Sequence, residues 1–139
     1  MIITLCSSAR FFDKLLDIKN AFELRGYEVL LPSMINYHHL GENALVKIHY
    51  NLIRDHFARI ERSDAIYVAN YDKDGIAGYI GGSAFLEIGK AFDKSIPIFL
   101  LNPIPQKISY REELLAMQPI VVGQNWDMVD HILKEKTHF

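Results

Sequence analysis

The chain of 139 residues has little of several features that mark specialised classes of protein. Its single cysteine, Cys6, excludes an internal disulfide framework and is typical of a reducing compartment. No apolar run approaches the roughly 20 residues that span a bilayer. The opening residues, MIITLCSS, lack the charged region of a signal peptide. We therefore expect a soluble, cytoplasmic protein with no membrane partner.

Motifs for the common nucleotide-binding folds and metal sites are also missing. No GxGxxG follows the first expected strand and no GxxxxGK[ST] occurs, which argues against a dinucleotide fold and a P-loop NTPase. The net charge of −2 gives no general attraction to nucleic acid. His38, His39, His49 and His56 lack HExxH spacing and a cysteine partner, so we expect no metal and no other cofactor.

Short apolar runs alternate with amphipathic helical stretches along the whole chain. The runs are nearly continuous in apolar residues, as expected for strands covered on both faces. This alternation predicts an α/β fold: one domain over 1–139, with a doubly wound, five-stranded, mainly parallel sheet and helices on both faces. The expected strands are 2–7, 27–32, 64–70, 96–102 and 119–123, and the expected helices are 11–26, about 44–62, one through Glu87, 110–117 and 126–136.

In such sheets ligands bind beyond the carboxyl ends of the strands, at the point where the strand order reverses. Three loops should therefore form the site: CSSAR after the first strand, NYDKDG after the third strand, and the glycine-rich turn into the Glu87 helix. The loop NYDKDG begins with Asn70. Arg10 could pair with a phosphate, or could simply begin a helix. Tyr71 and Tyr79 could stack on a base, or could pack onto the core.

The stretch GYIGGSAFLEIGKAF, residues 78–92, places Glu87 in a helix that follows a glycine-rich turn. One interpretation is structural. An acid near a helix N-terminus interacts favourably with the helix dipole by about 0.3–1 kcal/mol. Ser83 is then the natural cap, and Phe85, Ile88 and Phe92 face the core.

The other interpretation is catalytic. Gly78, Gly81 and Gly82 allow close approach of backbone to a ligand, and the first amides of the helix, including that of Ser83, can hold an anion. A carboxylate beside such a surface suits cleavage of a glycosidic bond, because it can stabilise an oxocarbenium-like transition state or attack the anomeric carbon.

The order SDAIYVAN followed by GSAFLEIGKAFDKSIPIFLL resembles the nucleoside 2-deoxyribosyltransferase superfamily, which includes 2′-deoxynucleoside 5′-monophosphate N-hydrolases. The resemblance covers the layout from Met1 to about Asn102 and is specific in its motifs over about 64–101. It rests on a glycine-bearing loop, a helix that opens with E-[IL]-G-x-A, and a strand after a K-x-P-I turn.

This resemblance implies roles for particular residues. Glu87 takes the place of the family's nucleophilic glutamate. Ser7 and Ser8 stand in the first loop, which contacts the sugar or its 5′ group. The family's further acid corresponds to His56, with Asp55 adjacent, and either of these or Asp74 would help to protonate the departing base.

The sequence thus predicts an enzyme that cleaves the N-glycosidic bond of a (deoxy)nucleoside or its 5′-monophosphate, by hydrolysis or by sugar transfer. One alternative is a phosphoribohydrolase of the cytokinin-activating type. Enzymes of that type have a PGGxGTxxE turn, and the stretch GGSAFLE of this chain resembles it. Another is a nucleotide sensor without catalysis. The resemblance also implies a homodimer or larger homo-oligomer, for which the apolar and aromatic residues of segment 37–53 are candidate contacts.

Overall fold

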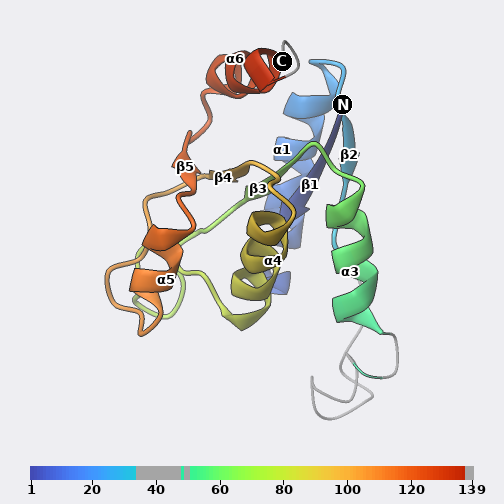
Figure 1. The fold of residues 1–139 in the computed structure, drawn as a ribbon. Helices are drawn as coiled ribbons and strands as arrows, with labels where there is room; N and C mark the ends of the chain where they lie inside the picture. The colour runs from blue at the N-terminus through green and yellow to red at the C-terminus, as the bar shows by residue number, and fades with distance from the viewer. Residues whose placement is uncertain (34–47, 49–50, 137–139) are drawn as a thin grey trace.

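The computed structural model describes residues 1–33, 48 and 51–136. In this part of the chain five strands form one parallel sheet in the order β2-β1-β3-β4-β5, with helices on both faces (Figure 1). The predicted doubly wound α/β fold is confirmed. The strands are β1 (Ile2–Cys6), β2 (Glu28–Leu30), β3 (Ala65–Val68), β4 (Ile98–Leu100) and β5 (Ile120–Val121).

Each helix expected from the sequence has a helix at its place in the described residues, and one short 3-10 turn is additional. The helix expected from about 44 to 62 is interrupted at Asn51, whose left-handed backbone (φ +51°) precedes the observed helix. Its residues 44–47, 49 and 50 lie outside the described residues. So do His38, His39, His49 and most of segment 37–53. The helices are η1 (Ala9–Phe11, a 3-10 turn), α1 (Phe12–Glu23), α3 (Leu52–Glu61), α4 (Gly82–Asp93), α5 (Arg111–Ala116) and α6 (Trp126–Lys136).

Each face of the sheet has its own apolar core, because successive strand residues point to opposite faces. On β3, Tyr67 packs with α1 and α6, whereas Ile66 and Val68 pack with α3, α4 and α5. All three side chains are at most 1% exposed. This double cover explains why the strands read as continuous apolar runs in the sequence.

The core-facing side of α4 differs from the expected one. Ala84, Ile88 and Ala91 are buried, while Phe92 is 51% exposed. The prediction for Phe92 is therefore wrong. With its core-facing side the helix packs against β3 and β4, and it also contacts α3.

The strand order reverses between β1 and β3, which are neighbours in the sheet while their following helices lie on opposite faces. The loops after these two strands diverge and leave a hollow beyond the carboxyl ends of β1 and β3. Over the described residues, every helix is too short or too polar to span a lipid bilayer.

Candidate active site

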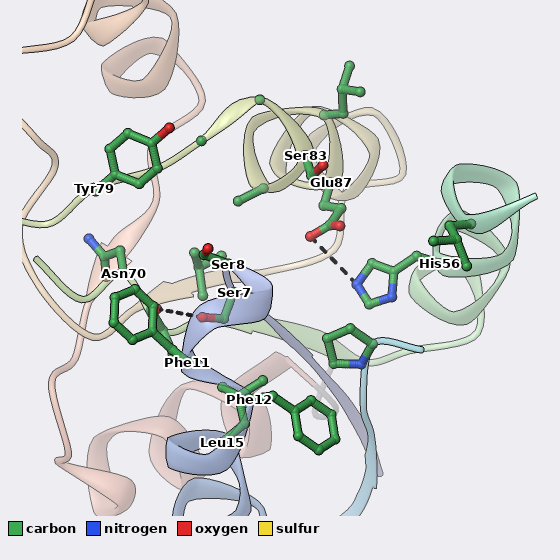
Figure 2. A pocket seen from close by; sticks show the side chains of 18 of the residues that line it. Ser7, Ser8, Phe11, Phe12, Leu15, His56, Asn70, Tyr79, Ser83 and Glu87 are labelled. Carbon is green, nitrogen blue, oxygen red and sulfur yellow. Dashed lines mark hydrogen bonds and ion pairs between the residues drawn. The ribbon is translucent and has the colours of Figure 1, made fainter. Parts of the chain in front are cut away.

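A cavity of about 380 Å³ opens at the carboxyl ends of β1 and β3 (Figure 2). This volume lies in the range of small-molecule sites, roughly 300–1,000 Å³. Among the described residues, its wall combines aromatic rings, small polar groups and one carboxylate. The residues that line the cavity include Ser7, Ser8, Phe11, Phe12, His56, Phe57, Asn70, Lys73, Tyr79, Gly81, Gly82, Ser83 and Glu87.

Glu87 points from α4 into this cavity, toward His56 (Figure 2). Its side chain is only 15% exposed. It follows Gly82, where α4 begins, by five residues, and the first turn contains no acid. Because the dipole effect falls off within the first turn, helix stabilisation does not account for this position. The cap of α4 is Gly81 and no side chain caps the helix, so the prediction of Ser83 as the cap is wrong.

Three side chains meet beneath the cavity, and one of them is Glu87. The Nε2 atom of His56 lies 3.6 Å from Glu87 Oε2 and 3.6 Å from the Sγ atom of Cys6. His56 is 5% exposed and Cys6 is fully buried. No described residue bonds to Nδ1 of His56. Burial, with the neighbouring Glu87, raises the pKa of the Cys6 thiol well above its usual value.

Burial also lowers the pKa of His56, from 6.5 to about 4, and the positive charge of Arg59 acts in the same direction. The negative charge of Asp55 opposes this shift. His56 is therefore neutral at pH 7. A neutral imidazole can orient a carboxylate, but it does not supply a proton as a cation would.

The three glycines of the glycine-rich turn have different steric surroundings. Gly78 has a φ of +64°, and a Cβ there would lie 2.5 Å from the carbonyl oxygen of Pro103, so only glycine fits. A Cβ on Gly81 would lie 3.1 Å from the Tyr79 ring. Gly82 has open space around it. Together they bring the first turn of α4, whose amides have no acceptor within the helix, to the edge of the cavity.

Asp74 and Arg10 do not line the cavity. Residues Lys73 and Ile76 pair across a tight turn, with positive φ at Asp74 and Gly75. The Asp-Gly pair is a strong signal for such a turn. The Asp74 carboxylate is 65% exposed and pairs with Arg10 at 3.3 Å. The structure therefore gives Asp74 a role in the turn and separates it from Glu87.

Asp55 also lies outside the cavity lining. Its carboxylate is 52% exposed, and it pairs with Arg59 at 3.2 Å and accepts a hydrogen bond from Ser33 at 3.4 Å. Asp55 and His56 are adjacent in α3, so their side chains leave the helix in different directions. Of the two, the structure brings only His56 to Glu87.

The two tyrosines considered for base stacking have different surroundings. Tyr79 lines the cavity, with Lys73 Nζ 5.1 Å from its ring centre. Tyr71 packs against Phe11, at 5.1 Å between ring centres, and against the core next to α1. Tyr71 is absent from the lining. The core-packing alternative therefore holds for Tyr71.

Asn70 borders the cavity, but its amide is used within the protein. Its Nδ2 donates to the carbonyl oxygens of Gly78, Asn102 and Pro103, at 3.2, 2.8 and 3.3 Å. Its Oδ1 accepts the backbone N–H of Asn102 at 2.9 Å. The side chain is 2% exposed. Asn70 therefore holds the glycine-rich turn against the loop after β4.

The first loop supplies small polar groups to the cavity. Ser7 donates to the carbonyl oxygen of Ala69 at 3.3 Å, which ties the ends of β1 and β3 together. Ser8 accepts a hydrogen bond from Lys73 at 3.1 Å. Lys73 is the only lysine or arginine among the described lining residues. The sequence analysis missed Lys73, because it interpreted the Asp-Gly turn signal beside it as possible chemistry at Asp74.

The buried, neutral His56 predicts a specific dependence of stability on pH. The unfolded state binds the His56 proton near pH 6.5, but the folded state only near pH 4. The contribution of neutral His56 to the free energy of unfolding is therefore fully present above pH 6.5 and is lost as the pH falls toward 4. Between pH 7 and pH 5 we expect a loss of about 2 kcal/mol in the free energy of unfolding. Urea titration of the wild type and of His56→Gln at both pH values isolates this contribution. Equal losses in both proteins would contradict it.

No protein-family model matches the chain, and no curated protein is significantly similar to it in sequence. Its fold is similar to that of a conserved protein from Enterococcus faecalis V583, with 14% identity, 98% coverage of both chains and a TM-score of 0.55. It is also similar to a 2-deoxyribosyltransferase from Bacillus psychrosaccharolyticus, with 19% identity, 93% coverage of this chain, 90% of that one and a TM-score of 0.53. At these identities the likeness shows the fold. This chain folds as a 2-deoxyribosyltransferase does, in agreement with the resemblance in its sequence.

Proposed function

We propose that the protein cleaves the N-glycosidic bond of a (deoxy)nucleoside or of its 5′-monophosphate, with Glu87 as the nucleophile. The observation that carries the proposal is the position of Glu87. Its carboxylate is largely buried, projects into a cavity of nucleoside size, and lies beside a neutral histidine. Neither the helix dipole nor a cap requires an acid there. The shared fold with a 2-deoxyribosyltransferase supports the same class of substrate.

In the proposed reaction a carboxylate oxygen of Glu87 attacks C1′ of the sugar. The C1′–N bond breaks, the base leaves with the bonding electrons and takes up a proton from water, and a glycosyl ester remains on Glu87. Water then releases the free sugar, or a second base takes the sugar. His56, neutral at pH 7, keeps the carboxylate oriented toward C1′ without forming a fixed ion pair with it.

The rest of the lining is suited to the other parts of such a substrate. Phe11, Phe57 and Tyr79 offer ring faces on which a base can stack. Lys73, Ser8 and the first amides of α4 provide a positive charge and hydrogen-bond donors for a 5′-hydroxyl or 5′-phosphate. These groups favour a monophosphate over a free nucleoside.

A panel of substrates tests the function. We expect base release, or exchange when a second base is present, with deoxynucleosides and their 5′-monophosphates, and a lower KM for the monophosphates. Chromatography of the free bases measures both reactions. Turnover restricted to N6-modified adenosine monophosphates would instead indicate the phosphoribohydrolase. Tight binding in calorimetry without release or exchange of any base would overturn the enzymatic proposal in favour of a sensor.

A further inference from the structure

Cys6, His56 and Glu87 form a cluster of three different metal-ligating groups from three elements, β1, α3 and α4. One ligand atom from each lies within 4.8 Å of the other two. Two of the separations, Sγ to Nε2 and Nε2 to Oε2, are 3.6 Å. Cys6 belongs to the core between the sheet and α4, and His56 is buried beside it.

These separations match the edges of a tetrahedral metal site. Zinc binds sulfur at about 2.3 Å, imidazole nitrogen at about 2.0–2.1 Å and carboxylate oxygen at about 2.0–2.2 Å. At a tetrahedral angle, sulfur and nitrogen are then about 3.5 Å apart, and nitrogen and oxygen about 3.4 Å. Small side-chain movements would bring all three atoms of the cluster into range.

From this geometry we infer that Cys6, His56 and Glu87 bind a divalent cation of the zinc class, with the fourth coordination position open to the cavity. Binding forms a sulfur–metal bond at Cys6 and releases the thiol proton to solvent. The thiolate and the carboxylate then balance the two charges of the cation, so the buried site is neutral. A thiolate and an imidazole favour Zn²⁺ or Co²⁺ over Mg²⁺.

The site has a consequence for activity, which rests on the proposed function. A carboxylate that donates its electrons to a metal cannot attack C1′. Zinc should therefore inhibit the reaction by occupying Glu87, in competition with the substrate in the same cavity. The binding of the metal itself does not depend on what the enzyme does.

Cobalt titration tests binding directly. Cys6 is the single cysteine of the chain, so a thiolate-to-cobalt charge-transfer band in the ultraviolet reports binding at Cys6 and at no other residue. We expect a saturable band at one equivalent, displaced by Zn²⁺ and unaffected by excess Mg²⁺. Calorimetry in buffers of different ionisation enthalpy should show release of one proton. Absence of the band would overturn the proposal.

Variants then separate the three-ligand site from a lone thiol. His56→Gln and Glu87→Gln should each weaken cobalt binding at least about tenfold, since even loss of an outer-shell group costs that much. His131→Gln is the matched control. His131 forms an exposed pair with Glu135 at 3.2 Å, the same residue types without a thiol, and its loss should leave the band unchanged. An unchanged affinity in both His56→Gln and Glu87→Gln would overturn the site.

Measuring base release in the presence of zinc shows whether the metal site or the proposed function has failed. If the enzyme turns over nucleosides and zinc inhibits it at the concentrations that displace cobalt, both proposals stand. If cobalt binds but no base is released under any condition, the metal site stands and the proposed function fails. If base is released and saturating zinc does not slow it, the inhibitory role is wrong.

Discussion

Replacing Glu87 by glutamine should lower turnover at least about 1,000-fold while the protein stays folded. In the proposed reaction the carboxylate oxygen forms a bond to C1′, an interaction made only on the way to the transition state. Glutamine has almost the same shape, but it is a far weaker nucleophile and does not stabilise the positive charge that develops on the sugar in the transition state. KM should change little, because the amide leaves the cavity wall in place. Initial rates of base release over a range of substrate concentrations measure both constants.

Stability provides the second measurement on the same variant. If Glu87 served only the helix dipole, its loss would cost at most about 1 kcal/mol and leave turnover intact. If it is a functional acid in a partly dry pocket, glutamine should leave the free energy of unfolding unchanged or slightly higher. Asp93→Asn is the control, since Asp93 is an exposed acid on the same helix outside the cavity. Near wild-type turnover in Glu87→Gln would end the catalytic interpretation.

The fold could be predicted because its signals are local and repeated. Continuous apolar strands such as Ala65–Val68, alternating with amphipathic helices, leave few arrangements other than a parallel sheet covered on both faces. The position of the cavity follows from that topology, since β1 and β3 flank the reversal of strand order. That Glu87 lines the cavity could be predicted because a glycine-rich turn and a stretch that resembles a family motif lie next to it.

The remaining parts of the site depend on contacts between distant segments, which periodicity does not encode. His56 meets Cys6 and Glu87 only because α3 and α4 pack side by side on the face of the sheet that carries Cys6. Lys73 reaches Ser8 through a hairpin whose Asp-Gly turn signal was interpreted as possible chemistry at Asp74. Polar residues in a loop near a predicted site look alike in sequence, whether they face the ligand or hold the loop.

Asn70 is the clearest case of this ambiguity, and its replacement should have the largest effect on stability. We expect Asn70→Ala to lower the free energy of unfolding by about 3–5 kcal/mol. The alanine removes a buried amide that serves three backbone carbonyls and the N–H of Asn102. Each buried polar group left unpaired costs about 1–3 kcal/mol, and water that enters the cavity would recover part of that cost. Urea unfolding followed by circular dichroism measures the difference.

Two further variants separate this structural role from the substrate-binding role that the sequence predicts for Asn70. Asn70→Asp keeps the size and the acceptor for the Asn102 N–H, but turns an oxygen toward the carbonyls of Gly78 and Pro103, so it should be destabilised at least as much as Asn70→Ala.

Asn125→Ala is the control. Asn125 also bonds to a backbone N–H, that of Met128 at 3.1 Å, but in an exposed position at the start of α6, and its loss should cost about 1 kcal/mol. If Asn70→Ala were as stable as the wild type and only its KM for nucleotides rose, the Asn70 amide would bind the ligand. Its hydrogen bonds between the glycine-rich turn and the loop after β4 would then contribute little to stability. A large loss of stability in both Asn70 variants, beside a small one in Asn125→Ala, would instead mean that Asn70 acts on the site by fixing the turn from which α4 carries Glu87 into the cavity.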